Sequence, residues 1–220
     1  KATASGLKLW SLAGKTLIPV VQGGMGVGIS AGGLAGTVAR MGAVGTISSV
    51  DLRRLHPDLM EKTRPLEKSR DVAHAKGVID AANNEALRRE IARAREISQG
   101  LGLIAVNVMK AISAYAQNVR TALEAGIDAV VVGAGLPLDL PELAKDHHKA
   151  ALIPILSDAR GVQLIVKKWE KKGRLPDAIV IEHPRLAGGH LGAAKIMDLN
   201  DPRFDFENVL PAVREFLRSA

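Results

Sequence analysis

The sequence contains no cysteine, and only 3% of its 220 residues are aromatic. The lack of cysteine excludes disulfide bonds, thiolate metal sites and a cysteine nucleophile. So few aromatic side chains provide little surface for stacking the bases of single-stranded nucleic acid, and no zinc-finger or recognition-helix pattern is found. No apolar run approaches the roughly 20 residues that span a bilayer, and the first residues do not form a signal-peptide core. We therefore expect a cytoplasmic protein that binds neither membrane nor nucleic acid.

Several catalytic and metal-binding signatures are also missing. There is no G-x-S-x-G turn for a serine hydrolase and no G-x-x-x-x-G-K-[ST] loop for nucleotide phosphates. His183 and His190 could suggest a metal pair, but the strand end supplies no carboxylate beyond Glu182, so we predict no metal site. His147 and His148 are typical of a polar helix end.

The composition suits a globular domain with a modest positive charge. Hydrophobic residues make up 47% of the chain, and the formal net charge is +7. The densest basic stretch, residues 167–174, ends at Gly173 and Arg174, as expected for the solvated carboxyl end of a helix. A basic nucleic-acid-binding protein remains the non-enzyme alternative, but an anionic small molecule is a better use of this charge.

Short apolar runs alternate with helical stretches along most of the chain. The predicted strands are residues 17–22, 43–48, 102–107, 128–133, 151–156 and 177–181, and the predicted helices are residues 31–41, 83–99, 113–125, 141–148, 159–171 and 206–217. Strands that are apolar throughout are typical of a parallel sheet buried on both faces. The pattern indicates six strand–helix units of an α/β fold, either an open sheet or a barrel.

The connection after the second strand is unusual. Residues 49–82 form a long polar excursion with Pro57 and Pro65 and no sustained periodicity, too long for a simple loop. A (β/α)8 barrel needs eight units, and about six are present, so we expect residues 1–220 to form a single barrel domain that is incomplete at its C-terminus.

Two glycine-rich loops follow predicted strands. Gly26, Gly28 and Ala31 fit G-x-G-x-x-A, and Asp51 follows at roughly the distance expected of a dinucleotide-binding fold. The pattern is weak in a chain with 22 glycines, and a tight turn explains it equally well. The second loop, residues 184–192, places His190 beside two glycines at a strand end, where α/β folds hold their chemistry and an imidazole can exchange protons near neutral pH.

Together, three segments resemble the nitronate monooxygenase family, formerly called 2-nitropropane dioxygenases. They are Pro19-Val20-Val21-Gln22-Gly23-Gly24-Met25-Gly26, Val106-Asn107-Val108-Met109 and Ala187-Gly188-Gly189-His190-Leu191-Gly192. The resemblance extends over essentially the whole chain and favours the barrel. It implies an FMN-binding (β/α)8 barrel that oxidises nitroalkanes or nitronates with O2. Flavin-type enoyl thioester reductases share this fold and loop, so an NAD(P)H-dependent flavin reductase is the alternative.

The resemblance also assigns roles to individual residues. Gln22, Gly23, Gly24 and Met25 would pass the flavin ring, and Asn107 would hydrogen-bond it. In the second loop, Gly188 and Gly189 would lie flat near the cofactor, and His190 would be the catalytic base that removes the α-proton of a nitroalkane.

Two positions depart from the family pattern. Leu186 stands where the loop usually has Glu, and His183 stands where a flavin-contacting Gln is common. These departures indicate a distinct subgroup of NAD(P)H-dependent flavin oxidoreductases and leave the substrate open. The partners implied are a small-molecule substrate and O2, with FMN as cofactor and NAD(P)H as an optional electron donor. Homo-oligomeric assembly is left open.

Overall fold

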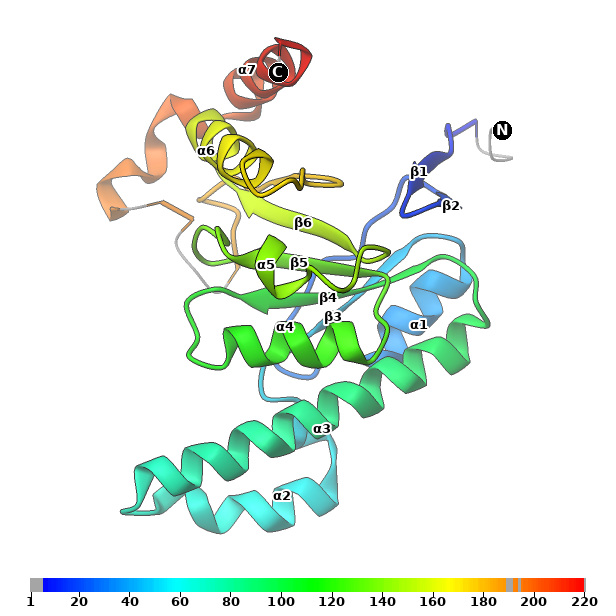
Figure 1. The fold of residues 1–220 in the computed structure, drawn as a ribbon, viewed down its shortest axis with the longest axis vertical. Helices are drawn as coiled ribbons and strands as arrows, with labels where there is room; N and C mark the ends of the chain where they lie inside the picture. Colours follow the sequence, from blue (N-terminus) through cyan, green and yellow to red (C-terminus); the bar gives the residue numbers. More distant parts are fainter. Residues whose placement is uncertain (1–5, 189–191, 194, 220) are drawn as a thin grey trace.

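The computed structural model describes residues 6–188, 192–193 and 195–219, and its centre is a five-stranded parallel sheet (Figure 1). The strands are β3 (Val44–Ser48), β4 (Leu103–Met109), β5 (Ala129–Gly133), β6 (Ala151–Leu156) and β7 (Val180–Ile181). They lie side by side in chain order, from β3 to β7. A dinucleotide-binding sheet reverses its strand order at the ligand crevice, whereas a barrel adds strands in one direction. The order therefore excludes the dinucleotide-binding alternative and identifies a partial (β/α) barrel.

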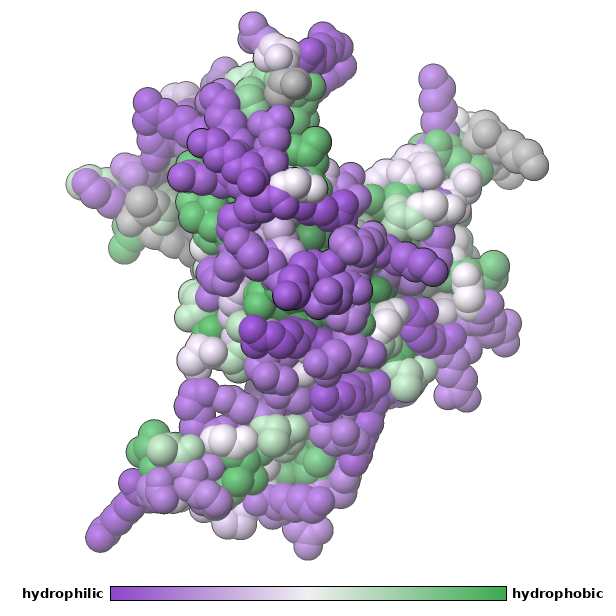
Figure 2. Space-filling view, in the orientation of Figure 1, coloured by the Kyte–Doolittle hydropathy of each residue, from purple (hydrophilic) through white to green (hydrophobic). Residues whose placement is uncertain are grey.

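The chain forms helices that mostly cover the outer face of the sheet and connect its strands (Figure 1). They are α1 (Gly32–Arg40), α2 (Pro57–Thr63), α3 (Val72–Ser98), α4 (Tyr115–Glu124), α5 (Leu140–Leu143), α6 (Ala159–Glu170) and α7 (Phe206–Ser219). Short 3-10 turns are η1 (Leu52–Leu55), η2 (Arg64–Lys68), η3 (Ile196–Asn200) and η4 (Pro202–Phe204). The outer surface of α3 and α4 is mainly hydrophilic, because these helices bury their apolar sides inward (Figure 2). Among the described residues, no helix is both long and apolar enough to cross a membrane.

The strands alternate their side chains between two separate cores. In β4, Ile104, Val106 and Val108 belong to the core between the sheet and the helices. Leu103 and Ala105 belong to the second core, on the other face of the sheet. An antiparallel hairpin, β1 (Trp10–Leu12) with β2 (Lys15–Leu17), closes this second core with two buried leucines. A sheet that buries both faces explains why its strands are apolar throughout.

The first predicted strand is the largest difference from the sequence analysis. Leu17 ends the hairpin strand β2, and the following residues form only one parallel bridge, between Val21 and Val44. The backbone still runs beside β3, since the Gln22 amide donates to Val44 O at 2.9 Å. Pro19 interrupts the run, and proline has no amide to donate to a sheet. Residues 20–22 therefore occupy the place of an edge strand with little regular pairing.

The predicted polar excursion is mostly helical. Residues 49–82 contain η1, α2, η2 and the first part of α3, which begins at Val72 rather than at residue 83. Asp71 caps α3 by accepting a hydrogen bond from the His74 amide at 3.0 Å. Together α2 and the first half of α3 extend beyond the sheet (Figure 1). The prediction missed this start because the residues from 72 to 82 are polar and include Gly77, a poor helix former.

Two predicted strands begin later than expected, and aspartates explain why. Residues Asp128 and Asp177 precede β5 and β7 instead of starting them. Each carboxylate accepts the amide of the second residue of the neighbouring strand, Asp128 from Ile104 at 2.9 Å and Asp177 from Leu152 at 2.8 Å. Both also pair with a basic side chain, Asp128 with Lys15 at 3.2 Å. At the start of each strand pair, the aspartate side chain thus accepts an amide that a backbone carbonyl would otherwise accept.

Candidate functional site

The glycine-rich segment that precedes α1 is fixed to β3 by the side chain of Gln22. The Gln22 Oε1 atom accepts the Thr46 amide at 3.0 Å, and Nε2 donates to Thr46 O at 3.1 Å. The carboxamide thus pairs with β3 as a backbone peptide would, and Nε2 is also within donating reach of Gly23 O. Because both ends of this side chain are engaged, Gln22 holds the segment in place and presents the following glycines at the carboxyl end of the sheet.

Gly23 and Gly24 differ in what surrounds them. A Cβ added at Gly24 would lie 2.6 Å from the Asn107 Cβ and 2.8 Å from its Cγ, distances that real carbon atoms do not reach. A Cβ at Gly23 would meet nothing within 4 Å. The two exposed glycines therefore form a stretch of backbone without side chains. Gly24 contacts Asn107, and Gly23 faces open space.

Asn107 lies near the end of β4, paired in register with Ser48 of β3 and Val131 of β5. Alternation along β4 places its side chain on the same face as Leu103 and Ala105, inside the curve of the sheet. The Asn107 carbonyl accepts the Ser49 amide at 3.1 Å, but within the described residues its half-buried carboxamide forms no hydrogen bond. This side chain has two donors and an acceptor ready for a ligand.

Met25 begins a compact turn that leads into α1. Its amide donates to Ser30 Oγ at 2.7 Å, and the Ser30 amide donates back to Met25 O at 3.0 Å. The Ser48 amide donates to Ser30 O at 2.9 Å, which ties the turn to β3. The Met25 amide is therefore already used within the loop, while its side chain remains 42% exposed.

The second predicted loop follows β7 at the opposite edge of the sheet from Gln22–Met25. Gly188 is exposed, and a Cβ there would meet nothing within 4 Å. Gly189 and His190 lie outside the described residues, so their predicted roles stay predictions. Just beyond them, Gly192 returns to the sheet, where an added Cβ would lie 3.3 Å from Ser157 Oγ. The structure thus brings Gln22, the glycines, Met25 and Asn107 together, and it places Gly188 on the other side.

A cavity of about 660 Å³ opens between the loops that follow β5, β6 and β7. Its lining includes Leu136, Ser157, Glu182 and Gly192, together with residues at the start of α6. Gly192 and Ala193 border it directly. Carboxyl ends of barrel strands are where substrates bind in this architecture.

A polar cluster of Lys110, Tyr115 and Asp139, which the sequence analysis did not single out, lies at the end of β4. Lys110 Nζ contacts both carboxylate oxygens of Asp139 at 2.8 Å and sits 4.0 Å from the centre of the Tyr115 ring. The Tyr115 hydroxyl donates to Asp139 at 3.3 Å. Burial, followed by the Asp139 charge, raises the pKa of Tyr115 above its usual value. The position of Lys110 directly after an apolar strand was the available signal, and the cluster fixes the loop after β4.

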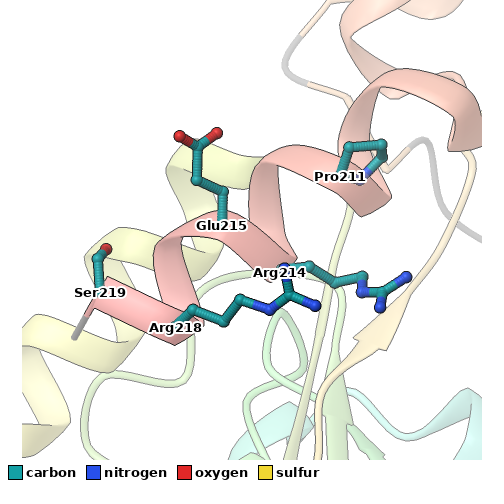
Figure 3. Close-up of a pocket in the computed structure, with 5 residues that line it drawn as sticks. All are labelled: Pro211, Arg214, Glu215, Arg218 and Ser219. Atoms are coloured by element: carbon teal, nitrogen blue, oxygen red, sulfur yellow. The ribbon is translucent and has the colours of Figure 1, made fainter.

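A second depression, of about 520 Å³, runs along α7 (Figure 3). Its lining comes from α7 alone: Pro211, Arg214, Glu215, Arg218 and Ser219. Figure 3 shows Glu215 pointing away from the two arginines. None of the predicted site residues lies there, and we assign it no part in the site. Within the described residues, no group of three or more His, Cys, Asp or Glu side chains is placed to hold a metal ion.

Comparison with models of known protein families shows to which family this chain belongs. A family model described as nitronate monooxygenase matches residues 8–216. The chain belongs to the nitronate monooxygenase family. No curated protein sequence matches the chain.

Solved structures support the same fold for this nitronate monooxygenase family member. A nitroalkane oxidase from Streptomyces ansochromogenes has a TM-score of 0.59 at 16% identity, covering 90% of this chain and 55% of that one. FabK from Thermotoga maritima has a TM-score of 0.56 at 20% identity, covering 82% of this chain and 45% of that one. A point mutant of that FabK matches with a TM-score of 0.51. The chain therefore spans about half the length of these structures and shares the barrel fold.

Proposed function

We propose that this chain forms part of an FMN-dependent oxidoreductase of the nitronate monooxygenase type. The observation that carries the proposal is the family match over residues 8–216. The geometry around Asn107 supports a flavin at this place, because a planar ring needs bare backbone beside it and a polar group at its edge. Gly23 and Gly24 offer the backbone, and the Asn107 carboxamide offers the polar group without a competing partner in the described residues.

FMN, when bound, supplies two-electron oxidation and reduction, and the protein supplies binding and orientation. Gln22 holds the glycines against β3, so they are positioned before any ligand arrives. Asn107 would orient the ring by hydrogen bonding from β4. The Met25 side chain, which is exposed while its amide is engaged, would contribute apolar contact. Gly188 and Gly189 would line the opposite side.

His190 is proposed as the base that removes the α-proton of a nitroalkane. Imidazole has an ordinary pKa of about 6.5, so a large neutral fraction is available to accept a proton near pH 7. The cavity bordered by Gly192 has room for a small organic substrate. O2 is the proposed electron acceptor.

Turnover measurements test this activity. The purified protein, supplied with FMN, is expected to consume O2 when a neutral nitroalkane is added. A His190→Asn variant is expected to keep flavin and lose turnover of neutral nitroalkanes by about 10²-fold or more, the usual contribution of a general base. It should retain activity on preformed nitronates, which need no proton removed. Unchanged turnover of neutral nitroalkanes would remove His190 from the mechanism.

The second candidate is an NAD(P)H-dependent flavin reductase, for example one acting on enoyl thioesters. Leu186 and His183 favour it because both depart from the nitronate monooxygenase pattern, and Leu186 is 75% exposed near the proposed site. Steady-state oxidation of NADH and NADPH with candidate acceptors separates the two candidates. Faster turnover with an enoyl thioester than with any nitroalkane would favour the reductase.

A further inference from the structure

The start of α1 is capped by a carboxylate from another helix. Glu90, in the middle of α3, is only 2% exposed. Its Oε2 atom accepts the Gly32 amide at 2.6 Å, and its Oε1 atom lies 3.1 Å from His56 Nε2. The residue at the usual capping position of α1 is Ala31, which has no side-chain oxygen to accept a hydrogen bond. Glu90 therefore supplies the cap that the local sequence lacks.

Close packing fixes the position of α1 relative to α3. A Cβ added at Gly32 would lie 2.4 Å from Glu90 O, and one at Gly36 would lie 2.8 Å from Ala94 O. The backbones of the two helices thus approach too closely for any side chain at these glycines. A movement of α3 at Glu90 would carry the first turn of α1 with it.

This contact lies next to the proposed flavin loop. Gly32 is two residues after Ser30, which is fully buried and bonds both Met25 and Ser48. The contact from Glu90 thus reaches Met25 through the short chain segment between Ser30 and Gly32 and the hydrogen bonds between Ser30 and Met25. A negative charge at a helix N-terminus is favourable, and a buried carboxylate keeps its position only while its hydrogen-bond partners are present.

We propose that Glu90 is a positioning residue for the cofactor site. Through the Gly32 amide it holds the start of α1, and hence the turn from Met25 to Ser30, in the arrangement that presents Gly23 and Gly24 beside Asn107. The helical excursion between β3 and β4 thus acts on the cofactor loop and is more than a cover for the sheet. The proposal rests on the proposed flavin function, but its effect on the loop is measurable without flavin.

The test compares three variants of the full chain. Glu90→Ala removes the acceptor, Glu90→Gln keeps an oxygen at the same reach without charge, and Ile165→Ala weakens the core at α6, away from the loop. Amide hydrogen exchange of residues 23–36 is measured without flavin, and FMN affinity is measured by fluorescence quenching. We expect Glu90→Ala to speed exchange in this segment and weaken FMN binding about fivefold to tenfold, as for a lost helix cap.

Rescue by glutamine separates positioning from general stability. Glu90→Gln is expected to bind FMN within about twofold of the parent protein, because its oxygen still accepts the Gly32 amide. Ile165→Ala is expected to lower the unfolding midpoint while leaving exchange at 23–36 and FMN affinity unchanged. If Glu90→Ala does not fold, Glu90→Asp replaces it, since the shorter side chain withdraws the oxygen, and it should bind FMN more weakly than Glu90→Gln.

Three results would overturn the proposal. The first is unchanged exchange and FMN affinity in Glu90→Ala, and the second is equal weakening in Ile165→Ala. The third is tighter FMN binding by Glu90→Asp than by Glu90→Gln. Failure of the parent protein to bind FMN would instead contradict the proposed function, while the exchange comparison would still decide whether Glu90 positions the loop.

Discussion

Gly24 and Asn107 lie in direct contact, so close that a Cβ on Gly24 would come within 2.6 Å of the Asn107 Cβ. They belong to segments more than 80 positions apart in the chain, one before α1 and one at the end of β4. The sheet brings them together because residues 20–22 run beside β3 and β3 pairs with β4. This contact is the best described part of the proposed flavin site.

Substitution of Gly24 tests this contact. Gly24→Ala is expected to push the loop away from β4, lower the unfolding free energy by about 1–3 kcal/mol as overpacking does, and weaken FMN binding. Gly77→Ala, on the exposed part of α3 and outside the proposed site, is the control, since its Cβ would meet nothing within 4 Å. Chemical denaturation and FMN titration of both variants provide the measurements. Equal behaviour of the two alanine variants would show that the loop does not lie against Asn107.

The Asn107 carboxamide is predicted to act on the ligand and not on the fold. Because it has no hydrogen-bond partner within the described residues, Asn107→Ala should change unfolding free energy little. It should weaken FMN binding about threefold to tenfold, the range for one lost hydrogen bond. Asn107→Asp keeps the shape and removes the donor, so its affinity reports whether the amide donates. A large loss of stability in Asn107→Ala with unchanged FMN affinity would contradict this role.

Packing of α1 on the sheet depends on Gly45 in β3. An added Cβ there would lie 1.9 Å from Ala35 O, a backbone atom that cannot rotate away. We expect Gly45→Ala to destabilise the protein by more than about 3 kcal/mol, beyond ordinary overpacking. Gly77→Ala, on the exposed part of α3, meets nothing within 4 Å and should stabilise by about 0.5–1 kcal/mol. Thermal unfolding compares the two, and similar midpoints would contradict the packing described.

Tyr115 provides a prediction at high pH. Its pKa is raised in the folded state by burial and by the nearby Asp139 carboxylate. The stability that it contributes is therefore fully present below the unfolded value of about 10 and is lost as pH rises beyond that value toward the folded pKa. Each pH unit in that window should cost at most about 1.4 kcal/mol relative to Tyr115→Phe. Urea unfolding of the parent protein and of Tyr115→Phe from pH 9 to 11.5 measures this difference. Unfolding free energies that change with pH in parallel for the two proteins would contradict it.

Much of the sheet was predictable because burial on both faces makes parallel strands apolar. The runs at 43–48, 102–107 and 151–156 correspond closely to β3, β4 and β6. Asp128 and Asp177 were assigned to strands because each precedes an apolar run, and sequence periodicity does not show that a carboxylate replaces the first strand hydrogen bond. Asp71, as a capping residue, was a usable local signal for the start of α3 that the polar composition obscured.

The site was predictable only in part, because sequence motifs do not show which polar groups already form hydrogen bonds within the protein. The Gln22–Met25 segment and Asn107, which the resemblance assigns to the cofactor site, lie near each other because Gly24 packs against Asn107. The resemblance did not indicate that the Gln22 carboxamide pairs with Thr46, nor that the Met25 amide binds Ser30. No sequence motif indicates the role of Glu90, because that role depends on the close approach of two helices that are distant in sequence.

Gly23, Gly24 and Asn107 are proposed to form one wall of a flavin site. The most direct measurement is FMN titration of the purified protein, followed by the visible absorption of bound flavin and repeated with Gly24→Ala and the control Gly77→Ala. We expect saturable binding with a perturbed flavin spectrum, weakened by Gly24→Ala and retained by Gly77→Ala. A protein that stays colourless after reconstitution, or one that binds FMN equally well with alanine at Gly24, would contradict it.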